Sequence, residues 1–248
     1  MPVHMRTKKW ARPELAVCPW YVEATENLRG TWNQRFASRQ PLHLELGCGK
    51  GVSTAQMVRA NPQINYIAMD ISPDVLGDAR RNIAAAWGEV TPPNVCLCRG
   101  NIEQIGWYIA PEDGVERVYI NFCNPWPRPR HQKRRLTHPR QLIQYRQFLT
   151  PGGEVWFKTD DADLYADSLI YFETAGYEPV YRTEDLHASG FAPNYISEHE
   201  ARFSQQGIPT RFGIFRKTDA VIDREFTRWE LDRSAADNNP PENQTATL

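Results

Sequence analysis

Residues Leu42-His43-Leu44-Glu45-Leu46-Gly47-Cys48-Gly49-Lys50-Gly51 form a short apolar run that leads directly into a turn of alternating glycines. The following residues, 52–60, contain no turn former and predict a helix. A strand, a glycine turn and a helix make up the first unit of a nucleotide-binding α/β sheet, where the backbone must approach a ligand too closely for a Cβ. We therefore expect the fold to be organised around this turn.

The spacing of the glycines favours S-adenosylmethionine over a dinucleotide. A dinucleotide turn has the pattern G-x-G-x-x-G, whereas the third glycine position of that pattern is Val52 here. Glu45, two residues before the first glycine, would repel a pyrophosphate but attract the ammonium and sulfonium groups of S-adenosylmethionine. Asp70 ends the next apolar run, 64–69, where folds of this kind bind ribose hydroxyls. A purely structural turn, and an Asp70 that only caps the following helix, remain alternatives.

Apolar runs and helical segments alternate along the chain with short connections, which predicts a doubly wound α/β fold. We expect a mostly parallel, Rossmann-like sheet of seven strands, with helices on both faces and an antiparallel last strand. The expected strands are 42–46, 64–69, 95–98, 115–122, 154–158, 177–182 and 210–216. The expected helices are 52–60, 73–87, 139–149 and 162–175.

The predicted domain organisation has three parts. Residues 1–40 would form a basic arm and a helix that covers one sheet edge, and residues 41–217 the main domain, with an insertion at 183–209. Residues 218–248 would form a C-terminal extension, whose polar, Asn- and Pro-rich tail after Arg233 is predicted to be disordered.

Composition predicts a cytoplasmic protein without a membrane segment or a metal site. There is no apolar run of about 18 residues and no hydrophobic leader. The five cysteines have no C-x-x-C spacing, which argues against a zinc site and a disulfide framework. The net charge of -1 hides a strong asymmetry, because residues 117–153 contain eight Lys or Arg and no acid, and residues 1–12 contain four more. Such basic patches are typical of a protein that binds a polyanion on one face.

Polar side chains follow the expected parallel strands at their carboxyl ends, where α/β sheets bind ligands. These residues are Glu45, Asp70, Asn101, Asn124 and Asp160. Asn124 begins a stiff Asn-Pro-Trp-Pro loop, and the basic run that follows it predicts phosphate contacts. An ordinary solvated loop is the alternative for that run. Its basic residues are Arg128, Arg130, Lys133, Arg134 and Arg135.

Over residues 5–217 the chain resembles the bacterial tRNA (guanine-N7-)-methyltransferases, a family of class I S-adenosylmethionine-dependent enzymes. Six segments carry the resemblance, two of which are hard to find elsewhere: the Pro-Trp-Pro loop with its basic run and the S/T-E-x-E-x-R/K-F segment. The segments are Met5–Trp10, Glu45–Gly51, Asn65–Ile67 before Asp70, Pro125–Arg128 with His131–Leu136, Thr159-Asp160 with Tyr165, and Ser197–Phe203 with Gly207.

The resemblance implies methyl transfer to N7 of guanine 46 in the variable loop of tRNA. Guanine N7 has a free lone pair, so the transfer requires alignment rather than a general base. The implied cofactor-binding residues are Glu45, Gly47, Gly49, Asp70, Asn101 and Asn124. The implied substrate-binding residues are Arg128, Asp160, Ser197 and Glu200, with RNA contacts at Arg130, Lys133, Arg134 and Arg135. Asn124 and Asp160 are the expected catalytic residues, and the enzyme would be a monomer or a homodimer.

Three positions depart from the family pattern. Asn124 stands where the family usually has the Asp of Pro-Asp-Pro-Trp, Asn101 replaces another acid, and Ser197 replaces a Thr. Because Asn-Pro-x-Trp is similar to the Asn-Pro-Pro-aromatic motif of amino methyltransferases, methylation of an adenine N6 or a cytosine N4 is an alternative. A catalytically silent RNA-binding protein is another.

Overall fold

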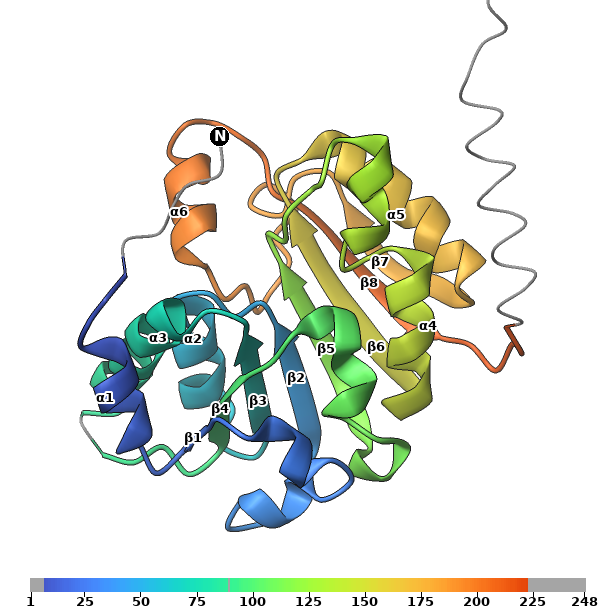
Figure 1. Cartoon of the computed structure of the whole chain (residues 1–248). Helices are drawn as coiled ribbons and strands as arrows, with labels where there is room; N and C mark the ends of the chain where they lie inside the picture. Colours follow the sequence, from blue (N-terminus) through green and yellow to red (C-terminus); the bar gives the residue numbers. More distant parts are fainter. Residues whose placement is uncertain (1–6, 89, 223–248) are drawn as a thin grey trace, which may run out of the picture.

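The glycine turn follows a central strand of a sheet that, in the described part of the chain, has eight strands. The computed structural model describes residues 7–88 and 90–222 (Figure 1). The strand order is β1-β4-β3-β2-β5-β6-β8-β7. The strands are β1 Tyr21–Val22, β2 Leu42–Leu46, β3 Asn65–Asp70, β4 Val95–Arg99, β5 Val115–Asn121, β6 Leu149–Thr159, β7 Tyr177–Thr183 and β8 Arg211–Lys217.

The sheet is parallel from β1 to β6, and β8 pairs antiparallel with both β6 and β7. Leu44 of β2 lies between Ile67 of β3 and Val118 of β5, so the three apolar runs share one register. β2 is buried along its whole length, as expected of a central parallel strand. The carboxyl ends of β2, β3, β5 and β6 therefore meet at one edge of the sheet.

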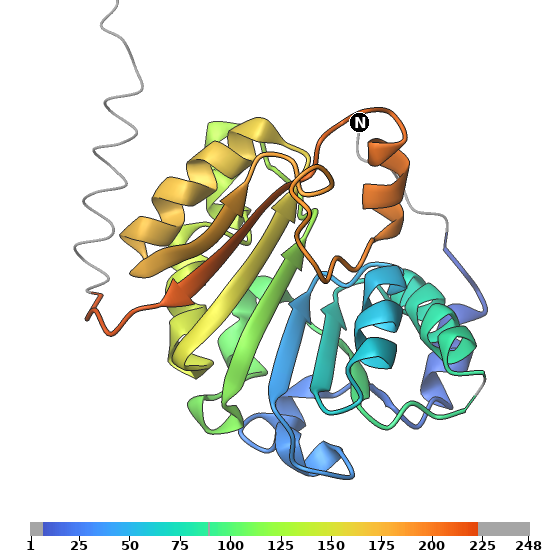
Figure 2. The ribbon, with the colours of Figure 1, turned by 180° about the vertical axis from the view of Figure 1, so that it is seen from behind.

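Helices pack on both faces of the sheet (Figures 1 and 2). Side chains of α1, α2 and α3 form a core with one face, and those of α4 and α5 form a core with the other. Helix α6 lies in the segment between β7 and β8. The helices are α1 Ala11–Ala16, α2 Val52–Ala60, α3 Pro73–Ala86, α4 Pro139–Phe148, α5 Ala162–Thr174 and α6 Glu198–Ser204. Short 3-10 turns are η1 Thr25–Leu28, η2 Trp32–Arg35, η3 Ile102–Trp107, η4 Pro111–Asp113 and η5 Pro129–Arg134.

The predicted fold class is confirmed, with one strand more than expected. The additional strand is β1, whose Tyr21 pairs with Leu97 on the outer edge of β4. The Leu97 amide donates to the Trp20 carbonyl at 2.9 Å, so this short segment satisfies backbone groups that an edge strand leaves open. Two residues are too few to give a strand periodicity in the sequence. Residues 7–40 contain one α-helix, α1, which packs on α3, and the two 3-10 turns η1 and η2.

The tail predicted to be disordered after Arg233 lies outside the described residues, as does Arg6 of the basic arm. Among the residues described, no helix has the length and apolar character needed to cross a lipid bilayer.

Candidate active site

A pocket lies at the carboxyl end of β2, between the glycine turn and helix α6. Its volume is about 560 Å³ including its open mouth. Residues far apart in the sequence form its walls. They are Glu45, Gly47, Cys48, Gly49, Lys50, Gly51, Val52 and Ser53 on one side, Asn121 and Phe122 at the end of β5, and Ser197, Glu198 and His199 on the other side.

The three glycines of the turn have different roles. All have positive φ angles, of 75° at Gly47, 56° at Gly49 and 67° at Gly51, which side-chain-bearing residues rarely adopt. A Cβ on Gly51 would lie 2.8 Å from the Cβ of Ala79, so this glycine lets α2 pack closely on α3. A Cβ on Gly47 or Gly49 would meet nothing within 4 Å. These two therefore leave the backbone accessible to a ligand in the pocket.

Glu45 is a buried carboxylate at the floor of the pocket. Its Oε1 accepts from Ser53 Oγ and Asn121 Nδ2, both at 3.1 Å, and its Oε2 accepts from Thr54 Oγ1 at 2.5 Å. Burial raises the pKa of Glu45, whereas the hydrogen bonds from Thr54, Asn121 and Ser53 oppose that rise. Two of the donors belong to the first turn of α2, so the carboxylate ties the strand to the helix that follows it.

Asn121 is a site residue that sequence reasoning missed. It is the last residue of β5, contacts Glu45 and lines the pocket. The available signal was its place near the carboxyl end of the apolar run 115–122. Asn124, three residues later, has the same side chain and was predicted as a site residue because two prolines follow it closely.

Asp70 lies at the end of β3, next to the glycine turn. Its Oδ2 accepts from the Gly49 amide at 3.1 Å and its Oδ1 from the Ser72 amide at 3.0 Å. Burial raises the pKa of Asp70, and these backbone hydrogen bonds oppose the rise. The carboxylate thus fixes the turn and the start of α3 together. Asn101, after β4, caps η3, with its Oδ1 accepting from the Glu103 amide at 3.1 Å, and it does not line the pocket.

Asn124 is exposed in the loop after β5 and does not line the pocket. Its Oδ1 accepts from the Trp126 amide at 3.0 Å. The loop contains two bulky residues in the left-handed backbone region, Phe122 with φ 53° and Trp126 with φ 42°. This conformation is costly for such residues and persists only where surrounding contacts enforce it.

Helix α6 is held on the sheet by a buried ion pair. Glu200 is fully buried, and its carboxylate accepts from Lys158 Nζ and from Asn194 Nδ2, both at 3.0 Å. Burial lowers the pKa of Lys158, while the adjacent Glu200 charge raises it. Ser197 is the N-cap of α6 and accepts from the Glu200 amide at 3.1 Å. The Glu200 carboxylate therefore faces the protein interior rather than the pocket.

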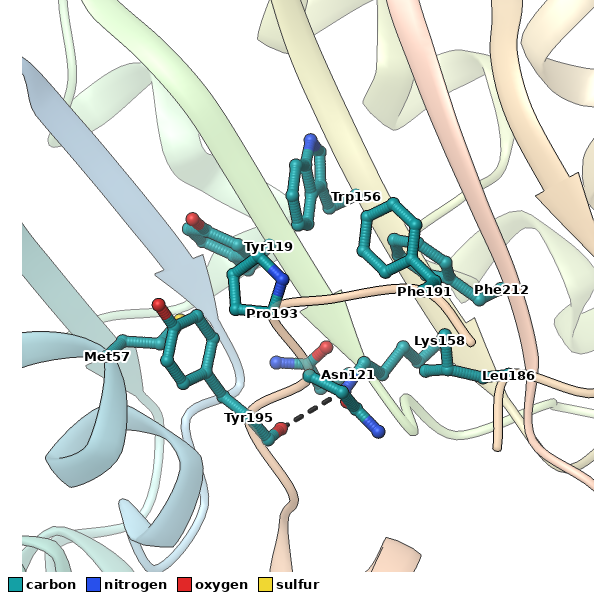
Figure 3. A pocket seen from close by; sticks show the side chains of 11 residues that line it. Met57, Tyr119, Asn121, Trp156, Lys158, Leu186, Phe191, Pro193, Tyr195 and Phe212 are labelled. Atoms are coloured by element: carbon teal, nitrogen blue, oxygen red, sulfur yellow. Dashed lines mark hydrogen bonds between the residues drawn. The ribbon is translucent and has the colours of Figure 1, made fainter. Parts of the chain in front are cut away.

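Lys158 also lines a second, smaller cavity beneath the segment between β7 and β8 (Figure 3). In that view Lys158 and Asn121 lie side by side, below an aromatic wall that includes Tyr119 and Trp156. Since Asn121 lines both cavities, the two are neighbours across the end of β5.

Asp160, after β6, faces α6. Its Oδ1 lies 3.3 Å from His199 Nε2, and the His199 ring stacks on Phe203 and contacts Phe122. His199 lines the pocket, so Asp160 lies one side chain behind its wall.

The residues of the basic run point in different directions. Arg128, Arg130 and Lys133 are exposed, and Arg134 is 47% exposed while it pairs with Glu103 at 3.0 Å. Arg135 is only 3% exposed, because its guanidinium is bound inside the protein. A phosphate would not reach the guanidinium there, so the structure contradicts the RNA contact that the sequence predicted for Arg135.

The structure thus brings together six of the fourteen site residues selected from the sequence. Glu45, Gly47, Gly49 and Ser197 line one pocket. Asp70 and Asp160 each contact a residue of its wall.

Comparison with known proteins identifies the family. Residues 39–211 match the model of a family described as "Putative methyltransferase". A tRNA (guanine-N(7)-)-methyltransferase of Clostridium botulinum (strain Eklund 17B) is 49% identical over 219 residues, which cover 88% of this chain and 100% of that protein. One of Desulfitobacterium hafniense (strain Y51) is 44% identical, with 86% and 96% covered. The chain belongs to the tRNA (guanine-N7-)-methyltransferase family. The family resemblance seen in the sequence is therefore confirmed, as is the assignment of the chain as an enzyme of that family.

Solved structures agree with the fold. The 16S rRNA methyltransferase KamB has a TM-score of 0.52 at 13% identity, over 72% of this chain and 88% of that one. An antibiotic-related methyltransferase has a TM-score of 0.51 at 14% identity with the same coverage. At such identities the likeness concerns the fold alone.

Proposed function

We propose that this member of the family transfers a methyl group from S-adenosylmethionine to N7 of guanine in tRNA, at guanine 46 of the variable loop. The observation that carries the proposal is the pocket between the glycine turn and α6, with the buried Glu45 at its floor. Curated relatives that align over their full length are named tRNA (guanine-N(7)-)-methyltransferases, which supports methyl transfer to guanine N7 of tRNA.

The donor set of the pocket fits the cofactor. Gly47 and Gly49 leave open space where a side chain would stand, and Glu45 offers a carboxylate near the site of a positively charged ligand. Asp70, adjacent to the turn, has lone pairs left for ribose hydroxyls. When bound, S-adenosylmethionine would supply the methyl group and keep the bonding electron pair on sulfur.

The residues of the chain would then align guanine N7 and exclude water. Asp160 and Ser197 are proposed to bind the base, with Asp160 accepting from its N1 and N2 hydrogens and stabilising the positive charge that develops on it. For this, His199 must release Asp160 or share it. Glu200 is proposed to act on the substrate indirectly, because its carboxylate is occupied by Lys158 and Asn194.

The amino methyltransferase alternative receives less support from the geometry. It requires the Asn124 oxygen to accept from an exocyclic amine, and that oxygen already accepts from the Trp126 amide in an exposed loop. The alternative also leaves the basic run unexplained.

One assay distinguishes the proposals. The protein is incubated with labelled S-adenosylmethionine and unmodified tRNA, and the digested RNA is analysed for its modified base. We expect 7-methylguanine, lost when guanine 46 is replaced by adenine. N6-methyladenine or N4-methylcytosine would favour the alternative, and tRNA binding without label would favour a silent RNA-binding protein.

Asp160→Asn tests the proposed base contact, with Asp163→Asn, an exposed acid on α5, as the matched control. Loss of one charge-assisted acceptor predicts a fall in kcat/KM of about tenfold to a hundredfold for Asp160→Asn alone. Equal rates in the two variants would remove Asp160 from the proposal.

A further inference from the structure

Two consecutive arginines at the end of η5 have opposite environments. The Arg134 side chain is on the surface, where its guanidinium lies 4.2 Å from the Trp126 ring and its Nε donates to Glu103 at 3.0 Å. Arg135 turns into the protein and is almost entirely buried. The same residue type at adjacent positions therefore serves different purposes.

The buried guanidinium bridges the loop after β5 and helix α5. Arg135 Nε donates to the Pro125 carbonyl at 2.7 Å. Arg135 Nη1 donates to Asp167 Oδ2 at 2.5 Å and to the Tyr171 hydroxyl at 3.3 Å. Asp167 and Tyr171 are one turn apart on α5, so they present both acceptors on one face of that helix.

The loop that Arg135 holds is the strained one at the mouth of the candidate active site. Pro125 lies between Phe122 and Trp126, the two non-glycine residues with positive φ in the described part of the chain. Proline has no amide hydrogen, so its carbonyl is the only backbone group by which the loop can be held at that point. A charge-assisted hydrogen bond in a buried setting is among the stronger contacts available for this purpose.

A neighbouring contact fastens the same segment to α5. Thr137 Oγ1 and Ser168 Oγ are 2.7 Å apart and buried. The segment that follows η5 is thus docked on α5 through two residues, Arg135 and Thr137, so α5 supports the loop.

We propose that Arg135 is a positioning residue: its guanidinium holds the Pro125 carbonyl, and with it the 122–127 loop, against Asp167 and Tyr171 of α5. This role goes beyond the proposed function and rests on it only where methyl transfer is the readout. The fork of Arg is essential, because Nε and the terminal nitrogen bind in different directions, whereas Lys offers one point charge.

The test compares Arg135→Lys, Arg135→Gln and Asp167→Asn with Arg134→Gln and Asp163→Asn as matched controls. For each, kcat and KM for tRNA methylation, the salt dependence of tRNA binding and hydrogen exchange of the 122–127 amides are measured. We expect Arg135→Lys to lower kcat by about tenfold to a hundredfold, because small misplacements at a reacting centre have effects of that size. Asp167→Asn should show a smaller loss of the same kind.

The Trp126 amide should exchange faster in Arg135→Lys and Asp167→Asn, since the loop that carries it is loosened. In Arg135→Gln, the salt dependence of tRNA binding should be the same as in the wild type. Arg134→Gln should instead weaken tRNA binding and flatten its salt dependence. Asp163→Asn should leave the exchange of the loop amides unchanged.

The proposal is overturned if Arg135→Lys and Asp167→Asn leave the loop amides protected, or if Arg135→Gln flattens the salt dependence as Arg134→Gln does. Asp167→Asn guards against a misfolded variant, because its half-exposed side chain tolerates an isosteric amide. If even the wild type fails to methylate tRNA, the proposed function fails, while the exchange and salt measurements still decide the role of Arg135.

Discussion

At the scale of single residues, the candidate site depends on where carboxylates and amides find their hydrogen bonds. Glu45 accepts from Ser53 and Thr54 of α2. Asp70 accepts from the amide of Gly49 in the glycine turn and from that of Ser72, the N-cap of α3. These contacts fix the glycine turn before any ligand binds, which is the pre-organisation that a tight site requires.

The glycines of the turn offer a direct test of this division of roles. Gly51→Ala combines a strained φ with a clash on Ala79, so we expect a loss in the free energy of unfolding of about 2–4 kcal/mol. Gly49→Ala meets no protein atom and should cost only about 1–2 kcal/mol. Gly49→Ala should nevertheless weaken S-adenosylmethionine binding. Urea unfolding measures the stabilities, and calorimetric titration measures the affinity for S-adenosylmethionine. A wild-type affinity in Gly49→Ala would contradict the view that the ligand lies against the Gly49 backbone.

Asn124 provides a second test at this scale. Asn124→Asp keeps the oxygen that accepts from the Trp126 amide, and it restores the acid that the family usually has, so we expect methyl transfer to be preserved or raised. Asn124→Ala removes the acceptor and should lower the rate. Steady-state kinetics of both variants decide the matter: a large loss in Asn124→Asp would show that the amide itself has a role.

His43 makes stability depend on pH. Burial in the core, together with the nearby Arg117 charge, lowers the pKa of His43 to about 3. In the unfolded chain His43 binds a proton below about pH 6.5, whereas in the folded chain it stays neutral there. The free energy of unfolding therefore falls as the pH drops below that value. Between pH 7 and pH 5 this group alone should cost about 2 kcal/mol. We expect the corresponding difference to shrink in His43→Gln in urea titrations at the two pH values. An unchanged difference would mean that folding does not lower the pKa of His43.

At the scale of elements, the position of α6 rests on Lys158 and Glu200. The helix is too short to be stable alone, so its place depends on contacts with the sheet. The buried pair is flanked by Asn194, and His187 Nε2 lies 3.1 Å from the Glu200 carboxylate. Removal of one buried partner leaves a charge without its counterion.

Lys158→Met should therefore lower the free energy of unfolding by about 3–5 kcal/mol. Lys50 offers a matched control, since it pairs with Glu198 of the same helix but is about half exposed. Lys50→Met should cost less than about 1 kcal/mol. Hydrogen exchange should show α6 opening in the first variant only. Similar losses in the two variants would contradict the view that the buried pair holds the helix.

The elements themselves could be predicted from the sequence, but the directions of several side chains could not. Buried parallel strands are apolar runs, so β2, β3 and β5 were recognisable, and with them the sheet edge that collects Glu45 and Asp70. In contrast, nothing local distinguishes Arg134 from Arg135. Their divergence depends on Asp167 and Tyr171, which only the folded chain brings near.

The loop after β5 shows the same limit. Asn121, the last residue of β5, meets Glu45 of the adjacent β2, whereas Asn124 lies further along, in a loop with left-handed backbones at Phe122 and Trp126. Residue type did not indicate these conformations, because bulky side chains usually avoid them.

At the scale of the whole molecule, charge is unevenly distributed, as the proposed binding of tRNA by a nearly neutral chain requires. The net charge is -1, yet Arg128, Arg130, Lys133 and Arg134 are all exposed in one short stretch beside the loop after β5. Polyanion binding depends on such a local surface and not on the total charge.

A triple variant with Gln at Arg130, Lys133 and Arg134 tests this surface. Each lost phosphate contact should reduce the slope of log affinity against log salt by about 0.7–0.9. We expect a reduction of about 2 to 3 for the triple variant, while S-adenosylmethionine binding remains. Filter binding over a salt series measures it. Identical slopes would place the RNA on another face.

The pocket has one wall near the start of the main sheet and another on α6, well over a hundred positions later in the sequence. A ligand bound between them would contact both an early and a late part of the chain and would hold the two together. Protease digestion around α6 should then slow when S-adenosylmethionine is added, although that helix is remote in sequence from the glycine turn. Ligand binding at the glycine turn would in this way stabilise a helix that is distant from it in the sequence.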